Sequence, residues 1–477
     1  MRISFYTFGC TVNAYETQKL KASFLQRGDR IVEEGESDAV IINSCAITGA
    51  AEKQILRLIA RLKRKNPRRI VAVVGCYGES LLQKGRQAAP DVDILLGNDK
   101  FGICQLVHQF ASAQSRALPD DHGAFSVGGA SQGGRKGNAF LPGEEDWDKE
   151  RARFGTEDRE TGEDSGRKAG RKVSEAHAAA VSDEKTPLSG FLQVQNGCDN
   201  YCSYCIVPHL RGPSVSKDPE EIREALGEMA EQGYREIVLA GLNLGLYRCG
   251  GMELMDLLQM AEETPGIQRI RLSSLEPMDL NSRFLAEFSG IKKLVSHLHI
   301  SLQSGSDRIL QRMNRRYCFQ DYLSMITGIR RQLPGIAITT DLIVGFPGET
   351  EGDFRESMCN VIRCQFSDIH IFKYSQRKGT PAAVMPNQVT EHQKANRAMF
   401  LKGIKWQTKY NYTQSLLGKT VEAALFEAYG DGPLWRGYTS QNLPILVTSP
   451  EPPGEGSRQV RITETTVGED LLRGELL

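Results

Sequence analysis

The 477-residue chain lacks features that would place it in several classes of protein. No run approaches the ~20 apolar residues of a membrane span, so we expect no membrane partner. The first residues, MRISFYTFGC, do not follow the pattern of a signal peptide. The 59 basic residues balance the 59 acidic ones, so a nucleic-acid surface must be local. With eleven cysteines and no export signal, we expect a cytoplasmic protein whose thiols serve metal binding or catalysis.

Three cysteines stand close together in the run VQNGCDNYCSYCIVP. Cys198, Cys202 and Cys205 have the spacing C-x3-C-x2-C, and Tyr204 comes directly before the third. Three thiolates at this spacing can each bind one iron of a [4Fe–4S] cube, which leaves the fourth iron open to another ligand. His209 leaves an alternative open, because the three cysteines and this histidine could also enclose a zinc ion.

This loop resembles the signature loop of the radical S-adenosylmethionine (radical SAM) enzymes. The resemblance implies that the open iron binds the amino and carboxylate groups of SAM, and that Tyr204 packs near its adenine.

The first 111 residues alternate between strand-like and helix-like runs, which predicts an open parallel α/β sheet covered by helices. Strands are expected at Ile3–Phe8, Ala39–Asn43, Ile70–Gly75 and Val92–Leu96, and helices at Tyr15–Gly28, Ala50–Asn66, Glu79–Ala89 and Lys100–Phe110.

Three further cysteines, Cys10, Cys45 and Cys76, each follow one of the first three expected strands. The carboxyl ends of parallel strands gather at one edge of a sheet, so these thiols should meet there. We therefore expect a second three-thiolate cluster with an open iron, although buried core thiols are the alternative. Cys104 lies inside the fourth expected helix and should belong to the core.

The surroundings of these three cysteines resemble the cluster motifs of the methylthiotransferase family: GCTVNAYET, INSCAIT and VVGCYGE. That family joins such a domain, here residues 1–111, to a radical SAM core and a small β-domain called TRAM. The resemblance covers the chain except residues 112–186. Those residues lack apolar periodicity and predict a disordered linker, because they cannot bury enough surface to offset their ordering entropy.

Residues 187–414 contain six expected strands separated by helices, which indicates a (βα)6 partial barrel. The strands are Phe191–Gln195, Glu236–Ala240, Gln268–Ser273, Leu298–Gln303, Ala337–Val344 and Ile369–Tyr374. Functional groups of such barrels collect at the carboxyl ends of the strands. We expect the contacts to SAM there, although a structural role is an alternative for each: Tyr204, Gly241, Asn243, Ser274, Gln303 and Asp341.

Residues 415–477 read as five short strands with Gly- and Pro-rich turns, typical of a small OB-like barrel. The pattern resembles a TRAM domain, which implies RNA binding. Candidate contacts to phosphates and bases are Lys419, Arg436, Tyr438, Arg458 and Arg461.

The resemblance implies two [4Fe–4S] clusters and SAM as cofactors, with flavodoxin or ferredoxin as electron donor. The reaction would attach a methylthio group to a substrate carbon. YCIVPHLRGPS, LSSLEP, MNRRY and FKYSQRKGTPAA look most like the bacterial branch that acts on N6-threonylcarbamoyladenosine at position 37, in the anticodon loop of tRNA. Isopentenyl-adenosine in tRNA and an aspartate of a ribosomal protein are alternative substrates. A non-catalytic iron–sulfur protein that binds RNA is an alternative of another class.

Overall fold

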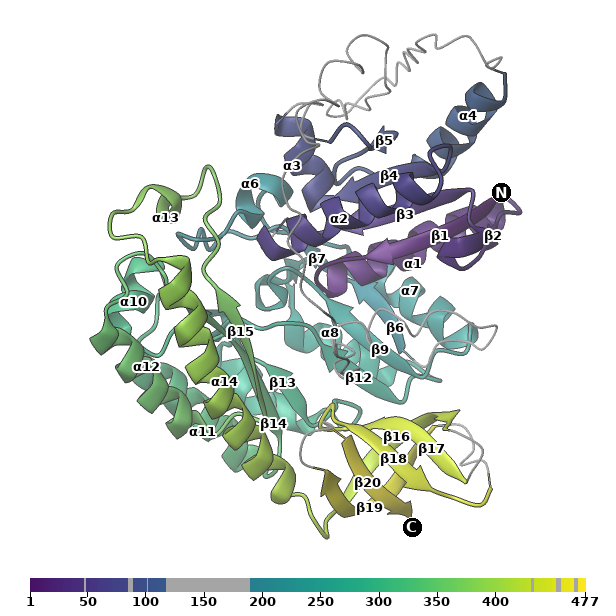
Figure 1. The fold of residues 1–477 in the computed structure, drawn as a ribbon. Helices are drawn as coiled ribbons and strands as arrows, with labels where there is room; N and C mark the ends of the chain where they lie inside the picture. Colours follow the sequence, from purple (N-terminus) through teal and green to yellow (C-terminus); the bar gives the residue numbers. More distant parts are fainter. Residues whose placement is uncertain are drawn as a thin grey trace, which may run out of the picture. The chain divides into compact units, whose positions relative to one another are not determined.

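The computed structural model of the protein describes residues 1–46, 49–84, 89–100, 102–116, 189–429, 433–451, 456–466 and 471–477. The described residues form two compact units, one ending before residue 117 and the other beginning after residue 188 in the sequence (Figure 1). The expected linker lies outside the described residues from 117 onward. Residues 112–116 belong to helix α4 (Ile103–Arg116), so the expected domain end at residue 111 was too early. None of the described helices is long and apolar enough to cross a membrane.

The first unit contains a five-stranded parallel sheet in the order β2-β1-β3-β4-β5. Its strands are β1 (Arg2–Thr7), β2 (Arg30–Ile31), β3 (Ala39–Ser44), β4 (Ile70–Gly75) and β5 (Ile94–Leu95). The short edge strand β2 was not predicted. Every residue of β3 and β4 is buried, as expected where helices cover both faces of a parallel sheet.

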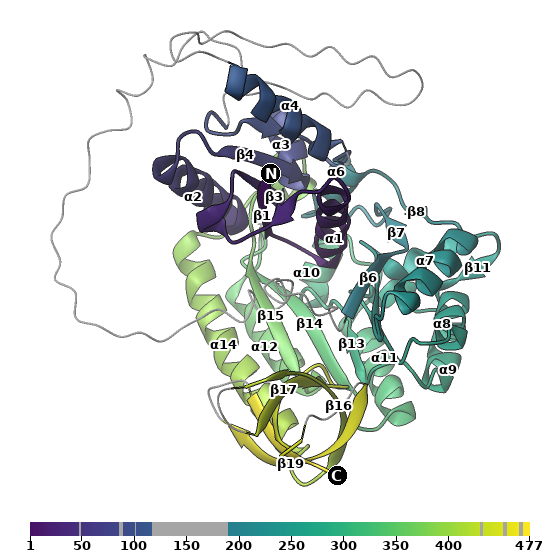
Figure 2. The ribbon, with the colours of Figure 1, turned by 90° about the vertical axis from the view of Figure 1, so that its right-hand side faces the viewer.

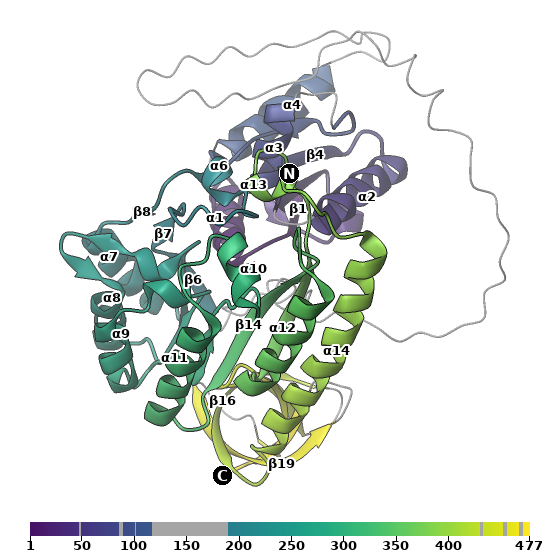
Figure 3. The ribbon, with the colours of Figure 1, turned by 90° about the vertical axis from the view of Figure 1, so that its left-hand side faces the viewer.

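The remaining helices of this unit are α1 (Thr11–Gln26), α2 (Gly49–Lys65) and α3 (Cys76–Lys84). Helices α1 and α4 share one apolar core with the sheet, through side chains such as Leu20, Phe24 and Val107. Figures 2 and 3 show α1 and α2 on opposite sides of the sheet. The predicted α/β architecture of this part of the chain is confirmed.

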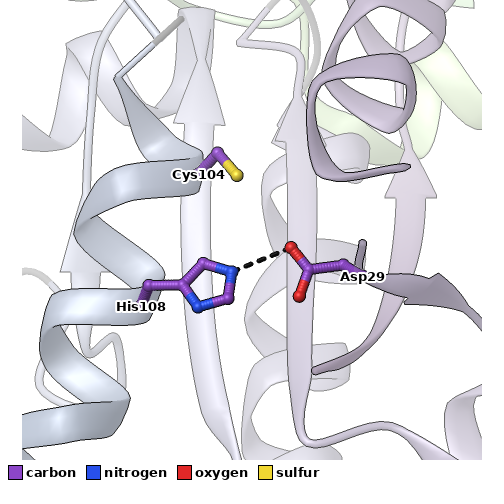
Figure 4. Close-up of side chains that lie close together, drawn as sticks. All are labelled: Asp29, Cys104 and His108. Carbon is purple, nitrogen blue, oxygen red and sulfur yellow. Dashed lines mark hydrogen bonds and ion pairs between the residues drawn. The ribbon is translucent and has the colours of Figure 1, made fainter. Parts of the chain in front are cut away.

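A cluster of polar side chains ties α4 to the end of the sheet where β1 begins (Figure 4). Asp29 accepts a bond from the Met1 amino group at 2.6 Å and lies 2.8 Å from Nε2 of His108. Burial would raise the pKa of Asp29, but the bonds from the Met1 amino group and from His108 outweigh it and hold that pKa below its usual value. Cys104 is buried in the adjoining core, as predicted, and burial raises the pKa of its thiol.

The second unit begins with six parallel strands in sequential order. Strands β12-β9-β6 and β13-β14-β15 form two three-stranded sheets, and parallel bridges from Ile270 to Leu294 and from Leu275 to Ile300 connect them. The strands are β6 (Ser189–Gln193), β9 (Glu236–Ala240), β12 (Arg269–Leu272), β13 (His297–His299), β14 (Ala337–Val344) and β15 (Asp368–Lys373). This order confirms the six-stranded partial barrel.

Helices cover the outer side of these strands. They are α7 (Pro219–Glu231), α8 (Leu254–Glu263), α9 (Ser282–Glu287), α10 (Asp307–Arg312), α11 (Phe319–Gln332), α12 (Glu351–Cys364) and α14 (Glu391–Gln414), with short helices α6 (Val207–Arg211) and α13 (Pro381–Val384) in loops. Figure 3 shows α11 and α12 in front of β14. Helix α7 begins where its sequence predicts, because the Asp218 side chain accepts from Glu220 N–H at 2.9 Å and Pro219 is its first residue.

The last five strands form a closed barrel in the order β16-β17-β18-β20-β19. They are β16 (Thr420–Ala428), β17 (Leu434–Thr439), β18 (Pro444–Thr448), β19 (Ser457–Thr466) and β20 (Leu471–Leu476). Their apolar side chains point inward and form a core of their own, with Ile445, Val447 and Val460 fully buried. The prediction of a small five-stranded barrel is confirmed.

A buried ion-pair network joins β6, β9 and β12 to this small barrel. Glu236 binds Arg269 Nε at 2.8 Å, Arg271 Nη2 at 3.2 Å and the Ser189 hydroxyl at 2.6 Å. Arg269 also donates to the Thr439 carbonyl at 3.3 Å. Burial opposes the charge of Glu236, but the two guanidinium groups outweigh it and lower its pKa from 4.5 to about 2.

The E236Q substitution is predicted to lower the free energy of unfolding at neutral pH by ~3 kcal/mol, the value of a pKa shift from 4.5 to about 2. Because the folded-state pKa is depressed, the contribution is complete above about pH 4.5 and is lost as the pH falls towards 2. Urea unfolding should therefore give equal differences between wild type and variant at about pH 7 and 5 and a smaller one at about pH 3.5. E224Q, on the exposed face of α7, is the control. A difference that stays constant down to the lowest pH would contradict this account.

Candidate functional site

The carboxyl edge of the first sheet carries the three predicted cysteines. Cys10 precedes the first residue of α1, Cys45 follows β3, and Cys76 is the first residue of α3. The register pairs Ser44 with Gly75, so the cysteines that follow these residues begin from adjacent positions. The loop after β1 approaches the same place, because a Cβ on Gly9 would lie 2.8 Å from Cβ of Cys45. The structure thus brings all three cysteines to one edge, and their role as cluster ligands stays a prediction.

Buried amides hold the three cysteine loops together. Asn13, three residues after Cys10, donates to the carbonyls of Phe8 at 3.1 Å and Ser44 at 3.2 Å. Asn43 in turn donates to the carbonyl of Asn13 at 2.9 Å. Gly75 has φ +91°, and a Cβ there would lie 2.7 Å from Oδ1 of Asn43. A glycine is therefore needed where β4 turns into the Cys76 loop.

Sequence reasoning missed the buried cation beneath these loops. Lys100 is fully buried and donates to Glu16 at 2.5 Å and to Oδ1 of Asn43 at 3.0 Å. It follows strand β5, just as the three cysteines follow strands β1, β3 and β4. This shared position after a strand of the sheet was the feature of the sequence that could have revealed Lys100. Its charge lies beside an edge that three thiolates would make strongly negative.

The cysteine loop of the second unit runs between β6 and α6. Cys202 is buried, whereas Cys198 and Cys205 are partly buried. Backbone bonds shape the loop: Cys205 N–H donates to the Cys202 carbonyl at 2.9 Å, and Cys198 N–H donates to the Gly212 carbonyl at 3.2 Å. His209 is exposed, and among these four described residues no three ligand atoms lie within 4.8 Å of one another. One zinc ion would need a closer group, so the zinc alternative finds no support.

The environment of the loop disfavours free thiolates. Burial raises the pKa of Cys198 to about 11 and that of Cys205 to about 12, and it also raises the pKa of Cys202. A bound metal must therefore displace protons, as thiolate sites do.

A buried arginine reaches the loop from the far side of the barrel. Arg315 follows α10, and its side chain is fully buried. It donates from Nη1 to Sγ of Cys202 at 3.2 Å and pairs through Nη2 with Glu276. Its Nε donates to the Tyr317 hydroxyl at 3.1 Å. The motif MNRRY contains Arg315, but the sequence did not predict its contact with Cys202. The bond joins residues 113 positions apart, so no local pattern reveals it.

Two expected SAM contacts lie directly beside the cysteine loop. A Cβ on Gly241 would lie 2.9 Å from Oε1 of Gln195, so the glycine permits this close approach. Asn243 is fully buried, accepts no bond at Oδ1 from the described residues, and donates through Nδ2 to Asp279 at 2.6 Å. Ser274 is exposed, and it is the neighbouring Ser273 whose hydroxyl accepts from Gly241 N–H at 3.1 Å.

The other three expected SAM contacts lie in surroundings that differ from one another. Tyr204 packs against an apolar cluster that contains Phe346 and Tyr374, which suits an aromatic beside an adenine. Gln303 has φ +67°, and its N–H donates to the Asp341 carbonyl at 2.8 Å. Asp341 lies within β14, not at its end, and two imidazoles already bind its carboxylate.

The residues around the loop fit an iron–sulfur cluster with SAM on its open iron. Besides Asn243, the buried amides of Asn196 and Asn200 each keep one polar atom without a partner among the described residues. Buried amide atoms normally find partners, so three orphans around one three-cysteine loop indicate a missing polar ligand. Thiol donors, a buried guanidinium and unpaired amides match a thiolate-bound cluster and the amino-acid group of SAM.

The fold and this site define a radical SAM protein. The Radical SAM superfamily matches residues 192–358, and "Uncharacterized protein family UPF0004" matches residues 2–97. The chain is 32% identical to threonylcarbamoyladenosine tRNA methylthiotransferase MtaB of Thermotoga maritima, over 87% of this chain and 84% of that protein. It is also 32% identical to tRNA-2-methylthio-N(6)-dimethylallyladenosine synthase of Syntrophomonas wolfei, over 98% and 92%. The radical SAM methyltransferase TsrM of Kitasatospora setae shares the fold at TM-score 0.50, with 13% identity and coverage of 80% and 77%.

The chain therefore belongs to the radical SAM tRNA methylthiotransferases. It is an enzyme that transfers alkylthio groups, and its family uses [4Fe–4S] clusters and SAM. The alternative of a non-catalytic iron–sulfur protein is wrong.

The bond from Arg315 to Cys202 should raise the reduction potential of a cluster held by this loop, because hydrogen bonds to ligand sulfur favour the reduced state. Replacing Arg315 alone would leave the buried Glu276 without its counter-ion. The double variant R315M/E276Q is therefore compared with the single variant E276Q. We expect a midpoint potential lower by about 60–120 mV, which corresponds to about 1.5–3 kcal/mol for a charge-assisted bond.

Redox titration followed by electron paramagnetic resonance measures this potential in the reconstituted protein, with iron and sulfide content as the check on cluster loading. R316M changes the exposed neighbour and should leave the potential unchanged. Equal potentials in R315M/E276Q and E276Q would show that Arg315 only braces the loop.

Proposed function

We propose that the enzyme attaches a methylthio group to C2 of N6-threonylcarbamoyladenosine at position 37 of tRNA, in the cytoplasm. The observation that carries the division of labour is the pair of three-cysteine sets, each at the carboxyl edge of its own parallel sheet. Cys198, Cys202 and Cys205 hold the cluster that binds SAM, and Cys10, Cys45 and Cys76 hold a second one. When bound, the first cluster and SAM supply one-electron cleavage of SAM, and the second supplies the sulfur-bearing site. The electron comes from a flavodoxin or ferredoxin.

The chain's own residues bind the cofactors and hold them in position. Arg315 and Glu276 neutralise each other beside the SAM-binding loop and fix Cys202. Asn196, Asn200 and Asn243 offer the unpaired amide atoms that suit the polar end of SAM. Tyr204, with the apolar cluster behind it, suits the adenine. In the first unit, the buried Lys100–Glu16 pair holds Asn43 in place beside the cysteine loops.

The choice of the threonylcarbamoyl substrate rests on the local motifs, because relatives named for either modified adenosine are equally identical to this chain. Of the cations at the end of β15 that could meet the threonyl carboxylate, Lys373 pairs with Glu391 at 3.1 Å, Arg377 is buried, and Lys378 is exposed. The enzyme must reach a base that is splayed out of the anticodon loop.

The C-terminal barrel is proposed to bind the tRNA. Tyr438 on β17 stacks on Phe426 of β16 with ring centroids 5.9 Å apart, and Phe426 is partly exposed. Arg436 lies two residues before Tyr438 on the same strand, Arg458 and Arg461 lie on β19, and Lys419 is exposed just before β16. Aromatic rings beside cations suit bases and phosphates of RNA.

The two cysteine sets should be separable by mutation. The variant C10A/C45A/C76A is predicted to keep SAM cleavage to 5′-deoxyadenosine and about half of the iron and sulfide, but to make no methylthiolated tRNA. C104A, which alters a buried cysteine of the same unit away from the sheet edge, should retain both activities. Liquid chromatography of the reaction products measures both. Loss of SAM cleavage together with thiolation in a folded triple variant would refute the division of labour.

The substrate is tested with three parallel reactions of the reduced, reconstituted enzyme. They offer tRNA with the threonylcarbamoyl group, tRNA with the isopentenyl group, and the small-subunit ribosomal protein. We expect a product only from the first, identified as the 2-methylthio derivative by mass spectrometry of its nucleosides. A methylthiolated product from either of the others, without one from the first, would overturn the assignment.

A further inference from the structure

A cluster of imidazoles and one carboxylate lies on the inner face of the partial barrel. His299 on β13, Asp341 on β14 and His370 on β15 occupy three adjacent parallel strands, and the register pairs Asp341 with His370. Helices α11 and α12 cover the opposite face (Figure 3), and Figure 2 views β14 from the other side. The two imidazole rings stack with centroids 5.3 Å apart.

Both imidazoles bind the same oxygen of Asp341. His299 Nε2 lies 3.3 Å from Oδ1, and His370 Nδ1 lies 3.2 Å from it. Nδ1 of His299 lies 2.9 Å from the Thr339 hydroxyl. Burial would lower the pKa of His299, but Asp341 outweighs this effect and raises it, so the carboxylate favours the charged form of His299.

These bonds determine what His370 offers to a ligand. A carboxylate can only accept, so Nδ1 of His370 carries the proton in this bond, and in that tautomer Nε2 is the acceptor. No described residue binds Nε2, and the His370 side chain is 51% exposed, against 11% for His299. An oriented hydrogen-bond acceptor therefore faces the open side of the barrel.

An aromatic ring lies next to this acceptor. Phe372 is two residues further along β15 on the same face and is 38% exposed. A large apolar ring at this exposure on the inner face of a barrel is a surface for a planar ligand. The ligand that suits both groups is a flat base whose substituent carries an N–H or O–H donor.

We propose that His370 and Phe372 receive the modified adenine: Phe372 stacks on the base, and Nε2 of His370 accepts a hydrogen bond from the ureido N–H or the hydroxyl of its side chain. Asp341 and His299 are positioning residues that hold the imidazole in this tautomer. This inference rests on the proposed function, and it assigns Asp341 to the substrate side, not to SAM.

The test measures binding of anticodon stem-loop RNA to the reconstituted holoenzyme by fluorescence anisotropy. One RNA carries the threonylcarbamoyl group and a matched RNA carries plain adenosine. Wild type should prefer the first by roughly tenfold, and H370F, which keeps a ring but removes the acceptor, should lose this preference. H370Q restores an acceptor and should recover part of it. F372A should weaken both RNAs alike by roughly tenfold, because stacking tolerates any base.

H392F alters an exposed histidine of α14 and should match wild type. An unchanged preference in H370F would overturn the inference, as would wild-type affinity in F372A. A metal ion bound stoichiometrically in wild type and absent from H370F would overturn it in favour of a metal site. Failure of wild type to methylthiolate threonylcarbamoyl tRNA would instead refute the proposed function, so the two failures are distinguishable.

Discussion

Parallel strands all release the chain at the same side of their sheet, and both units of this enzyme depend on that constraint. In the first unit it collects cysteines that are 31 to 66 positions apart in the sequence, because Cys10, Cys45 and Cys76 each leave a neighbouring strand. In the second unit it collects the loops that follow six strands around one cysteine loop. The chemistry needs ligands from distant segments, and the parallel sheet supplies them without long connecting loops.

Buried charges in both units are paired with fixed counter-ions at three places. Lys100 meets Glu16, Arg315 meets Glu276, and Glu236 meets two arginines. An unpaired buried ion would cost several kcal/mol, so these pairs reflect necessity more than added stability. Their position is nevertheless informative: two of the three pairs lie beside a three-cysteine set, where the bound cluster would add its own charge.

Local patterns predicted the architecture well. Strands β9 and β14 have the expected bounds, and the C-terminal barrel has its five strands, because alternation and turn residues are local properties. The strand ends also predicted where the cysteines gather. The side chains that contact these strand ends were not predictable from the sequence. Arg315 binds Cys202, and Lys100 binds Glu16, although the residues of each pair are far apart in the sequence. For the same reason, the sequence predicted Asp341 as a SAM contact from its place in a strand and did not reveal the two histidines that bind it.

The strand order of the C-terminal barrel bears on how the protein is made. Strand β20 lies between β18 and β19, so residues 471–476 complete the closed ring. During synthesis the other four strands emerge first and expose the two edges that β20 later covers. Open strand edges are templates for pairing with other chains. The barrel is therefore vulnerable to misassembly until β20 is in place, and truncation before residue 471 would leave those edges open permanently.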